Sequence, residues 1–562
     1  MTRRSRFELA AALALLAFAA LPAAATGAED PAAQPPFGGE QPPPALEPDS
    51  LTEPPPGFAI PAARAIELAG ASEVVRAELA ETPAAQPEAL IRGERWQVVY
   101  ADPEGTRVAE VILDGRSGEI EEAWRDQQLG SRLARGYEGA IAQKVNSPWV
   151  WLPLCLLFIA PFFDPRRPWR LLHLDLLVVL GLGVSLFFFN RAEITASVAL
   201  TYPVLGYLLI RLLVTGLWPR ERTGPLIPLA PVRWLAVGVA VLALGRIALN
   251  LADSQVIDVG VAGVIGADRI GDGAGLYEGD FAAIPGLRGD VYGAANYLAY
   301  LPFELVLGWD GSWDGVPAAH AAAITFDLVC IAGLVALGRR LRDGDAGRGL
   351  GWALGFAWAA CPWTLYTLNA NANDALIAAL SIGALLALGS PPARGALLAI
   401  AAAAKFGPAA LVPLFATAEG EDRRRGVIIF AIAFAAVGLA LTLPFLPDGG
   451  VREFYDRTLG YQATRSSPFS VWGQAPSLDF LQGPVRVGVV VLALGVGLYP
   501  RFKTPVQVAA LAGAVTIALQ LTATHWFYFY VVWFLPFVLV AAFAGQRQVT
   551  PGESPGARAA AS

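Results

Sequence analysis

The stretch RWLAVGVAVLALGRIALNLADSQVIDVGVAGVIGADRIGDGAGLYEGD, residues 233–280, contains the two features that decide the fold. Residues 233–252 form an apolar run close to the roughly 20 residues that a helix needs to cross a bilayer. The acidic side chains of residues 254–280 are Asp258, Asp268, Asp272, Glu278 and Asp280. The stretch therefore predicts a membrane-spanning helix that ends in a carboxylate-rich segment.

The composition of the whole chain also indicates a membrane protein. Of the 562 residues, 55% are hydrophobic and only 16% are charged, which is too little charge for a soluble protein of this length. The net charge is −7 and the arginines occur in short clusters between apolar runs, so no nucleic acid is predicted as a partner. Cys155, Cys330 and Cys361 lie in or near apolar segments without the spacing of a metal site, and we expect them to be small buried residues.

The amino-terminal part of the chain divides into three predicted regions. Residues 1–26 have the basic start, short apolar stretch and small residues of a signal peptide, with an uncleaved anchor as the alternative. Residues 27–57, rich in Pro, Ala and Glu, are predicted to be a disordered tether. Residues 58–146 are predicted to be a small extracytoplasmic α+β domain.

Within this small domain, the periodicity of residues 61–82 predicts a helix, and alternation predicts strands within 95–102 and 106–124. The segment VAEVILDGRSGEIEEAW, residues 108–124, resembles the hairpin of PepSY-type domains. The domain has no convincing catalytic cluster in its sequence, so we expect a binding or regulatory module.

The rest of the chain is predicted to be a polytopic α-helical membrane bundle of about 11 to 13 transmembrane helices. Arginine-rich loops mark the cytoplasmic side and place the small domain and the acidic stretch outside the cell. Residues 147–232 are predicted as accessory helices, 233–546 as the core and 547–562 as a disordered cytoplasmic tail. The predicted apolar segments of the bundle are 148–164, 172–189, 195–217, 233–252, 318–338, 350–367, 373–389, 395–417, 426–445, 486–500, 504–523 and 526–545.

Two apolar segments are not predicted to be simple spans. Residues 296–309 are too short to cross and are expected to be half-buried or interfacial. Residues 395–417 have arginines at both ends, so we expect a pair of short helices broken at KFGP, with Lys405 and Pro408 towards the outer face.

Three charged or titratable residues at the membrane margin are candidates for chemistry, because each is costly to bury without a partner. Asp258 follows the apolar run 233–252 and could act as a general base, or could be a helix-end residue that faces lipid headgroups. Lys405, one of only three lysines, could bind phosphate oxygens as a point charge, or could extend to a lipid headgroup. His525 begins an aromatic segment and is either a packed, hydrogen-bonded residue or part of the same site.

A family resemblance follows from the order of several segments across residues 233–545. The segment IDVGVAGVIGADRIGDGAGLY, residues 257–277, resembles the stretch after the first core helix of GT-C glycosyltransferases, especially polyprenyl-phosphate-mannose-dependent enzymes of the glycosyltransferase 87 type. The later segments that fall in the family's order are NYLAYLP (296–302), FDLVCIAGLVALGRRL (326–341), LNANANDALIAALSIGALLAL (368–388), AAAAKFGPAALVPLF (401–415), RSSPFSVWG (465–473) and THWFYFY (524–530).

The resemblance implies an inverting transfer of a sugar, mannose above all, from a polyprenyl phosphate to a lipid or glycan hydroxyl on the outer face of the plasma membrane. Asp258 would deprotonate the acceptor, while Lys405, His525 and Arg465 would hold the donor phosphate. For Arg465, a surface ion pair is the alternative. The predicted contacts to the sugar or acceptor are Tyr277, Tyr300, Asn371, Asn373 and Trp472. Asp272 and Asp280 have no metal-ligand spacing, so neither a metal nor a cofactor is expected.

Two non-enzymatic alternatives remain open from the sequence. A transporter or flippase of lipid-linked substrates would also have broken helices and intramembrane charges, although it is expected to show inverted repeats and no repeat is found. A PepSY-led envelope sensor with a non-catalytic membrane part is the other. The expected partners are the lipid-linked donor, the acceptor and membrane lipids.

Overall fold

The structure is a computed structural model. It describes residues 46–103, 105, 107–125, 129, 141–220, 222–228, 231–278, 289–312, 316–418, 423–464 and 467–547. The predicted signal peptide, most of the predicted tether, nearly all of the carboxyl-terminal tail, and Asp280 and Arg465 lie outside the described residues.

The amino-terminal domain is a four-stranded antiparallel sheet with two helices on one face. The strands follow one another in the order β1-β2-β3-β4, and Trp96, Val98 and Val111 are fully buried between the sheet and the helices. The elements are α2 (Ala62–Gly70), α3 (Glu73–Glu81), β1 (Gln86–Arg92), β2 (Arg95–Ala101), β3 (Arg107–Asp114) and β4 (Ile120–Arg125). The predicted small α+β domain is therefore confirmed, whereas its likeness to PepSY domains stays a prediction.

The domain differs from the prediction in two details. The single helix predicted over 61–82 is two helices, because the Ser72 side chain accepts a hydrogen bond from Val75 N and caps a new helix. Strand β1 was not predicted, since its sequence QPEALIR lacks alternation and contains Pro87. A proline is tolerated there because β1 is an edge strand of the sheet.

The remainder of the chain is mostly helical, as predicted. Six helical segments of the described chain are long and apolar enough to span a membrane: α7 (Leu171–Phe189), α8 (Ile194–Leu217), α9 (Val232–Ala252), α12 (Pro317–Leu341), α18 with η6 (Arg423–Phe445) and η8 with α22 (Pro476–Leu498). Shorter apolar segments are α6 with η4 (Pro148–Phe162), α15 (Asp374–Leu386), η5 with α17 (Gly407–Ala416), α23 (Pro505–Gln520) and η9 with α24 (Tyr528–Phe543). The protein is thus a multi-pass membrane protein with a small α+β domain.

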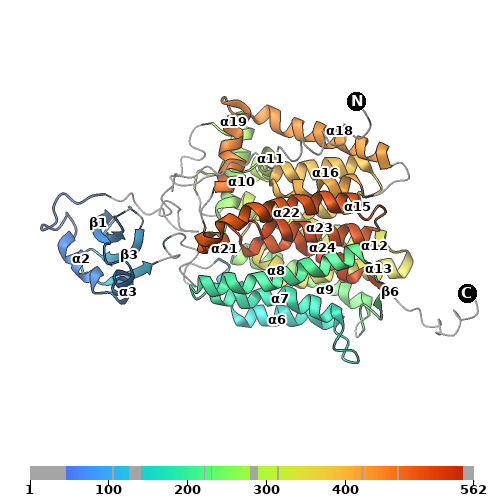
Figure 1. The fold of residues 1–562 in the computed structure, drawn as a ribbon, viewed down its shortest axis with the longest axis horizontal. Helices are drawn as coiled ribbons and strands as arrows, with labels where there is room; N and C mark the ends of the chain where they lie inside the picture. Colours follow the sequence, from blue (N-terminus) through green and yellow to red (C-terminus); the bar gives the residue numbers. More distant parts are fainter. Residues whose placement is uncertain are drawn as a thin grey trace, which may run out of the picture.

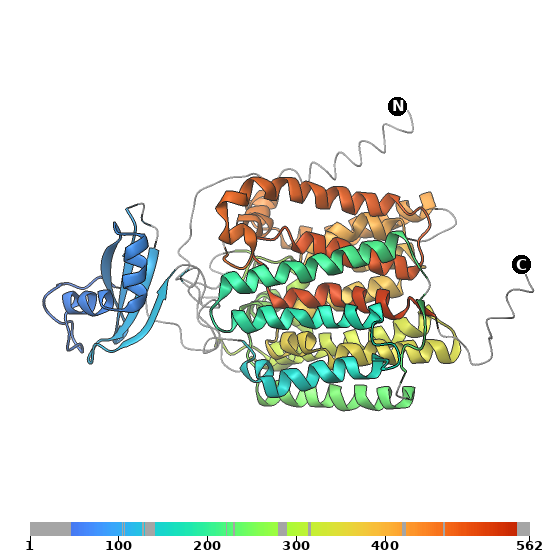
Figure 2. The same ribbon diagram turned by 60° about the horizontal axis from the view of Figure 1, so that its bottom comes forward.

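The helices run roughly parallel, with α6 on one side of the bundle and α18 on the opposite side (Figures 1 and 2). The sheet domain lies beyond one end of the bundle. The shorter helices α10 (Asp258–Gly271), α19 (Gly450–Tyr455) and α21 (Val471–Gln474) lie at that same end (Figure 1). We call this end of the bundle the domain end.

Two breaks in the helices occur at or shortly before a proline. The predicted segment 350–367 is two helices, α13 (Gly344–Ala360) and α14 (Pro362–Asn369), since Cys361 before Pro362 is held in an extended conformation. The break predicted at KFGP is confirmed, because α16 (Pro391–Ala404) ends before Lys405, which is also extended. The predicted short segment is α11 (Ala294–Leu307), whose 14 residues do not make it a candidate span.

Candidate functional site

Lys405 is the centre of a buried polar cluster. The break after α16 leaves its side chain among α15, α24 and the turn before α11. Its Nζ lies 2.7 Å from Oδ1 of Asp374, the first residue of α15, and the same oxygen accepts a hydrogen bond of 2.7 Å from Trp533 Nε1. The Lys405 and Asp374 side chains are only 8% and 2% exposed. The predicted point charge is therefore present but is paired with a carboxylate.

Three aromatic rings surround the ammonium of Lys405. Its Nζ lies 5.4 Å from the centre of the Tyr292 ring, 5.9 Å from that of Tyr530 and 5.3 Å from that of Trp533, within the range of cation–π attraction. Within the described part of the chain, Nζ donates only to Asp374. An ammonium has three N–H donors, so two of them remain for oxygen atoms of a ligand.

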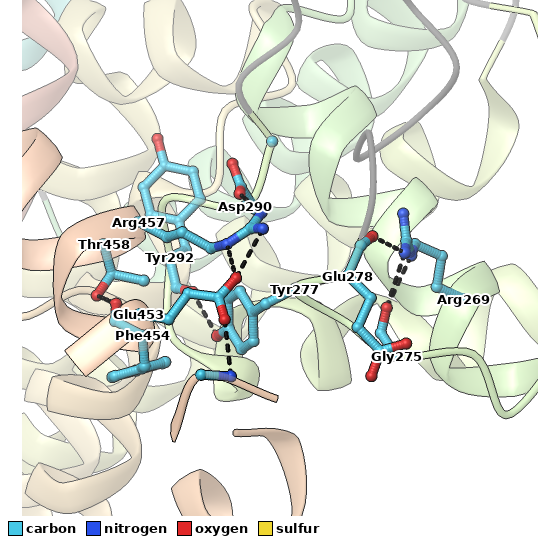
Figure 3. Close-up of polar contacts among 12 residues, drawn as sticks. Arg269, Gly275, Tyr277, Glu278, Asp290, Tyr292, Glu453, Phe454, Arg457 and Thr458 are labelled. Carbon is cyan, nitrogen blue, oxygen red and sulfur yellow. Dashed lines mark hydrogen bonds and ion pairs between the residues drawn. The ribbon is translucent and has the colours of Figure 1, made fainter. Parts of the chain in front are cut away.

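The backbone before α11 is fixed by two tyrosine hydroxyls, of which Figure 3 shows that of Tyr277. Tyr277 donates to the carbonyl of Tyr292 at 2.7 Å, and Tyr297 donates to the carbonyl of Gly289 at 2.5 Å. Burial raises the pKa of the Tyr277 phenol, which therefore stays a protonated donor. Tyr277, predicted to contact sugar or acceptor, is thus bonded to the turn that carries Tyr292.

Beside the cluster, α11 presents polar atoms without partners. Asn373 Nδ2 donates to Asn296 Oδ1 at 2.8 Å, which leaves Asn296 Nδ2 and Asn373 Oδ1 buried with no hydrogen bond among the described residues. The hydroxyl of Tyr300, one helical turn after Asn296, is also buried with no hydrogen bond among the described residues. Unpaired buried polar groups are costly, so each one in a folded protein needs an explanation, of which a bound ligand is one. Asn373, one of the predicted contact residues, directly precedes Asp374, and its partner Asn296 lies on the same helix as Tyr300, another predicted contact residue.

Asn371 has a structural role. It is fully buried with a positive φ of 49°, a conformation that asparagine tolerates better than most residues. Its Nδ2 donates to Ser254 Oγ and to the carbonyl of Gln255, and its Oδ1 accepts from Asn250 Nδ2. Asn371 therefore joins the turn before α15 to the connection between α9 and α10.

This connection brings Asp258 to the same turn. Ile257 N donates to the carbonyl of Ala370, and a Cβ on Gly260 would lie 2.6 Å from the carbonyl oxygen of Asn371. Asp258 is the first residue of α10 and is half-buried, and its Oδ1 accepts a hydrogen bond from Val259 N. The N-terminus of a helix favours a charged carboxylate. The structure thus links Asp258 and Lys405 through the short segment that ends at Asp374.

His525 reaches the cluster through Tyr530. Its Nδ1 lies 2.8 Å from Ser467 Oγ, and its ring centre lies 6.4 Å from that of Tyr530, which faces Lys405. Trp472 is half-buried and donates from Nε1 to the carbonyl of Leu521. Of the predicted phosphate ligands, His525 and Lys405 are therefore neighbours of one aromatic ring, while Arg465 lies outside the described residues.

The accessory helices contact the site from the other side. Tyr528 lies in the same 3₁₀ turn as Tyr530, and its hydroxyl lies 2.7 Å from Ser185 Oγ of α7 and 2.8 Å from Ser197 Oγ of α8. The Tyr528 ring stacks on that of Trp363 with their centres 5.6 Å apart. Helices α7 and α8, which had no functional explanation from the sequence, therefore fix the turn that carries Tyr530.

Sequence reasoning missed four members of the cluster, namely Asp374, Trp533, Tyr292 and Tyr530. Asp374 follows the predicted contact Asn373 directly, and a carboxylate at the start of an apolar helix is a signal that could have identified it. The three aromatic residues had no such signal, since tyrosine and tryptophan are common at membrane interfaces. No group of three or more His, Cys, Asp or Glu side chains suited to a metal ion occurs in the described ranges.

Comparisons with known proteins identify one part of the chain. Residues 291–545 match the family model described as Glycosyltransferase family 87. No curated protein and no solved structure gives a significant match. The matched range includes Tyr292, Asp374, Lys405, Tyr530 and Trp533 and leaves out Asp258, α7 and α8. Residues 291–545 of this multi-pass membrane protein are therefore similar to glycosyltransferase family 87.

Proposed function

We propose that the protein is a glycosyltransferase that moves a sugar, mannose in the first instance, from a polyprenyl phosphate to a hydroxyl of a lipid or cell-envelope glycan. The domain end would face outwards from the plasma membrane. The observation that carries the proposal is the buried Lys405 ammonium, which lies inside the family domain with two N–H donors left for a ligand. Phosphate oxygens would accept from these donors, and the surrounding rings suit the sugar face and the prenyl chain.

The reaction that fits this arrangement is a displacement with inversion at the anomeric carbon. Asp258 takes the proton of the acceptor hydroxyl while the oxygen of that hydroxyl bonds to the anomeric carbon. The bond between the anomeric carbon and the phosphate oxygen breaks, and polyprenyl phosphate leaves with the electron pair. Lys405, with His525 and Arg465 as further ligands, stabilises the charge that develops on the phosphate. The donor is already activated, so the proposal includes neither a cofactor nor a metal.

The remaining predicted contacts have two roles in this proposal. Tyr300 and Asn373 are assigned to the sugar, because their buried polar atoms have no partner among the described residues. Trp472 is assigned to the acceptor side. Tyr277 and Asn371 are positioning residues, since their hydrogen bonds hold the turns that carry Tyr292 and Asp374.

The proposal is tested by sugar transfer in proteoliposomes that contain a polyprenyl-phosphate mannose and a lipid acceptor. Asp258→Asn is expected to lower the rate by about 100-fold or more while the protein stays folded, because general-base catalysis contributes about 10²–10⁴-fold. Asp272→Asn is the matched control, since Asp272 is exposed at the other end of α10. Full activity of Asp258→Asn would remove Asp258 as the base. Absence of transfer from any lipid-phosphate sugar by the wild type, in folded form, would overturn the function.

A further inference from the structure

The external segment 449–464 packs against the turn that precedes α11. It consists of α19, the π-helical turn η7 (Asp456–Gly460) and α20 (Tyr461–Thr464). Phe454 of this segment contacts Tyr277 edge to face with the ring centres 5.3 Å apart, and lies 6.4 Å from the ring of Phe406, the neighbour of Lys405. The segment therefore covers the rim of the Lys405 cluster.

An ion triad joins the segment to the turn (Figure 3). Arg457 Nη1 lies 2.8 Å from Asp290 Oδ2, and Arg457 Nε lies 2.8 Å from Glu453 Oε1. The second oxygen of Glu453 accepts a hydrogen bond from Gly449 N at 2.9 Å. We call Asp290, Arg457 and Glu453 the latch. Its guanidinium connects two carboxylates, one from each side of the contact.

The local backbone suits this connection. Glu453 and Arg457 are four residues apart, so they share one face of the helix. Arg457 lies in a π-helical turn, a rare geometry that is frequent at functional sites. Burial alone would lower the pKa of Arg457, but its hydrogen bonds to Asp290 and Glu453 raise it instead. The guanidinium is therefore held as a cation between two acceptors.

The latch is connected to the site through the backbone between Asp290 and Tyr292. Asp290 comes two positions before Tyr292, whose ring faces the Lys405 ammonium at 5.4 Å. The backbone of Tyr292 is bonded on both sides, by Tyr297 to its N–H and by Tyr277 to its carbonyl. Release of Asp290 would free the start of this turn and allow the Tyr292 ring to move away from Lys405.

We propose that Arg457 is a positioning residue that holds Tyr292 over Lys405 through Asp290, and that the latch thereby sets the affinity of the site for the phosphate of a lipid-linked donor. This inference rests on the proposed function for the identity of the ligand. The Arg457, Asp290 and Glu453 side chains are 29%, 13% and 32% exposed, so salt partly screens the latch. Higher salt should therefore weaken binding in the wild type.

The test measures the affinity for farnesyl phosphate by tryptophan fluorescence, with Trp533 beside Lys405 as the reporter, and the amide hydrogen exchange of residues 289–297 and 449–464. Arg457→Gln is expected to weaken farnesyl phosphate binding about tenfold and to speed exchange in both segments about tenfold. Arg452→Gln is the matched control, because Arg452 lies in the same segment, on α19, but is 93% exposed. It should change neither measurement.

A double-mutant cycle separates the latch from unrelated effects. Asp290→Asn should reproduce the effect of Arg457→Gln, and the double variant should be no weaker than either single variant, because the two residues act through one contact. Additive losses, or faster exchange with unchanged affinity, would overturn the latch as a positioning device. If the wild type binds farnesyl phosphate but transfers no sugar, the proposed function is wrong. The role of the latch is then still tested by the affinity and hydrogen-exchange measurements. Failure of the wild type to bind farnesyl phosphate would overturn the phosphate site and the latch together.

Discussion

The ion pairs Arg246–Asp327 and Lys405–Asp374 are both buried in the helical bundle, but their surroundings differ. Arg246 Nε and Nη2 donate to the two oxygens of the Asp327 carboxylate, at 2.9 and 2.7 Å, and the third nitrogen, Nη1, donates to Ala359 O and Thr364 Oγ1. Asp327 also accepts from Trp358 Nε1. This pair joins α9, α12 and α13, and both of its carboxylate oxygens are bonded.

In the Lys405–Asp374 pair, some hydrogen-bond donors and acceptors have no partner among the described residues. Oδ1 of Asp374 accepts from both Lys405 and Trp533, while Oδ2 has no hydrogen bond among the described residues. Lysine is a point charge with rotatable donors, whereas arginine is a rigid fork that matches a carboxylate. The comparison teaches that a saturated buried pair fixes helices together, while an unsaturated pair next to other unpaired polar atoms marks a site for a ligand.

The largest effect on stability is expected at the saturated pair. Arg246→Leu should lower the free energy of unfolding by about 3–5 kcal/mol, because it leaves the Asp327 carboxylate buried without its cation. The measurement is thermal unfolding in detergent, followed by a maleimide dye that reacts with the fully buried thiols of Cys330 and Cys361 as they become exposed. The control is Arg246→Leu with Asp327→Leu, which removes both charges and should lose less. Equal losses in the two variants would show that the buried charge is not the cause.

The second prediction concerns the Lys405–Asp374 pair, where we expect a large effect on activity and a smaller effect on stability. Lys405→Gln should lower sugar transfer by about 100-fold or more, in the range found when one donor to a developing charge is removed. Its effect on stability is expected to be smaller than that of Arg246→Leu, since Trp533 still donates to Asp374. The measurements are the transfer rate in proteoliposomes and the same unfolding assay.

The double variant Asp374→Asn with Lys405→Gln separates the two roles of the pair. It removes both charges and should recover the stability lost in Lys405→Gln without recovery of transfer. If Lys405→Gln instead unfolds as readily as Arg246→Leu and retains its rate in the folded fraction, both pairs are structural and the comparison fails.

The sequence was sufficient for the parts of this comparison that depend on local chemistry. The helix break at Lys405 follows from Pro408, which lacks an N–H and cannot continue a helix. The strands within 95–102 and 106–124 followed from alternation around glycine-containing turns.

The partners of the two pairs could not be predicted, because they are set by packing between distant segments. Lys405 and Asp374 are 31 residues apart in the chain, Arg246 and Asp327 are 81 apart, and Trp533 and Asp374 are 159 apart. Contacts between residues so far apart produce no periodic pattern in the local sequence. Of the four charged members, only Lys405 was singled out from the sequence, because a charge within an apolar run is costly to bury without a partner.

The smallest effect is expected at Tyr528, where the hydrogen bonds are saturated as at Arg246 but lie beside the site. Its hydroxyl is bonded to Ser185 and Ser197 of the accessory helices. Tyr528→Phe keeps the ring stacked on Trp363 and should cost about 1 kcal/mol of stability, the typical net value of a buried hydrogen bond. Thr516→Val is a matched control, because Thr516 is buried and its hydroxyl bonds only within α23.

The two variants should differ in transfer rather than in stability. Since Tyr528 and Tyr530 share one turn, loss of the Tyr528 hydroxyl is expected to let the Tyr530 ring shift from Lys405 and to raise the KM for the donor several-fold, with the KM for the acceptor unchanged. Thr516→Val should leave both KM values as in the wild type. If Tyr528→Phe has the donor KM of the wild type but a lower melting temperature, the accessory helices have only a structural role. Fully hydrogen-bonded groups would then be structural both at Arg246 and at Tyr528.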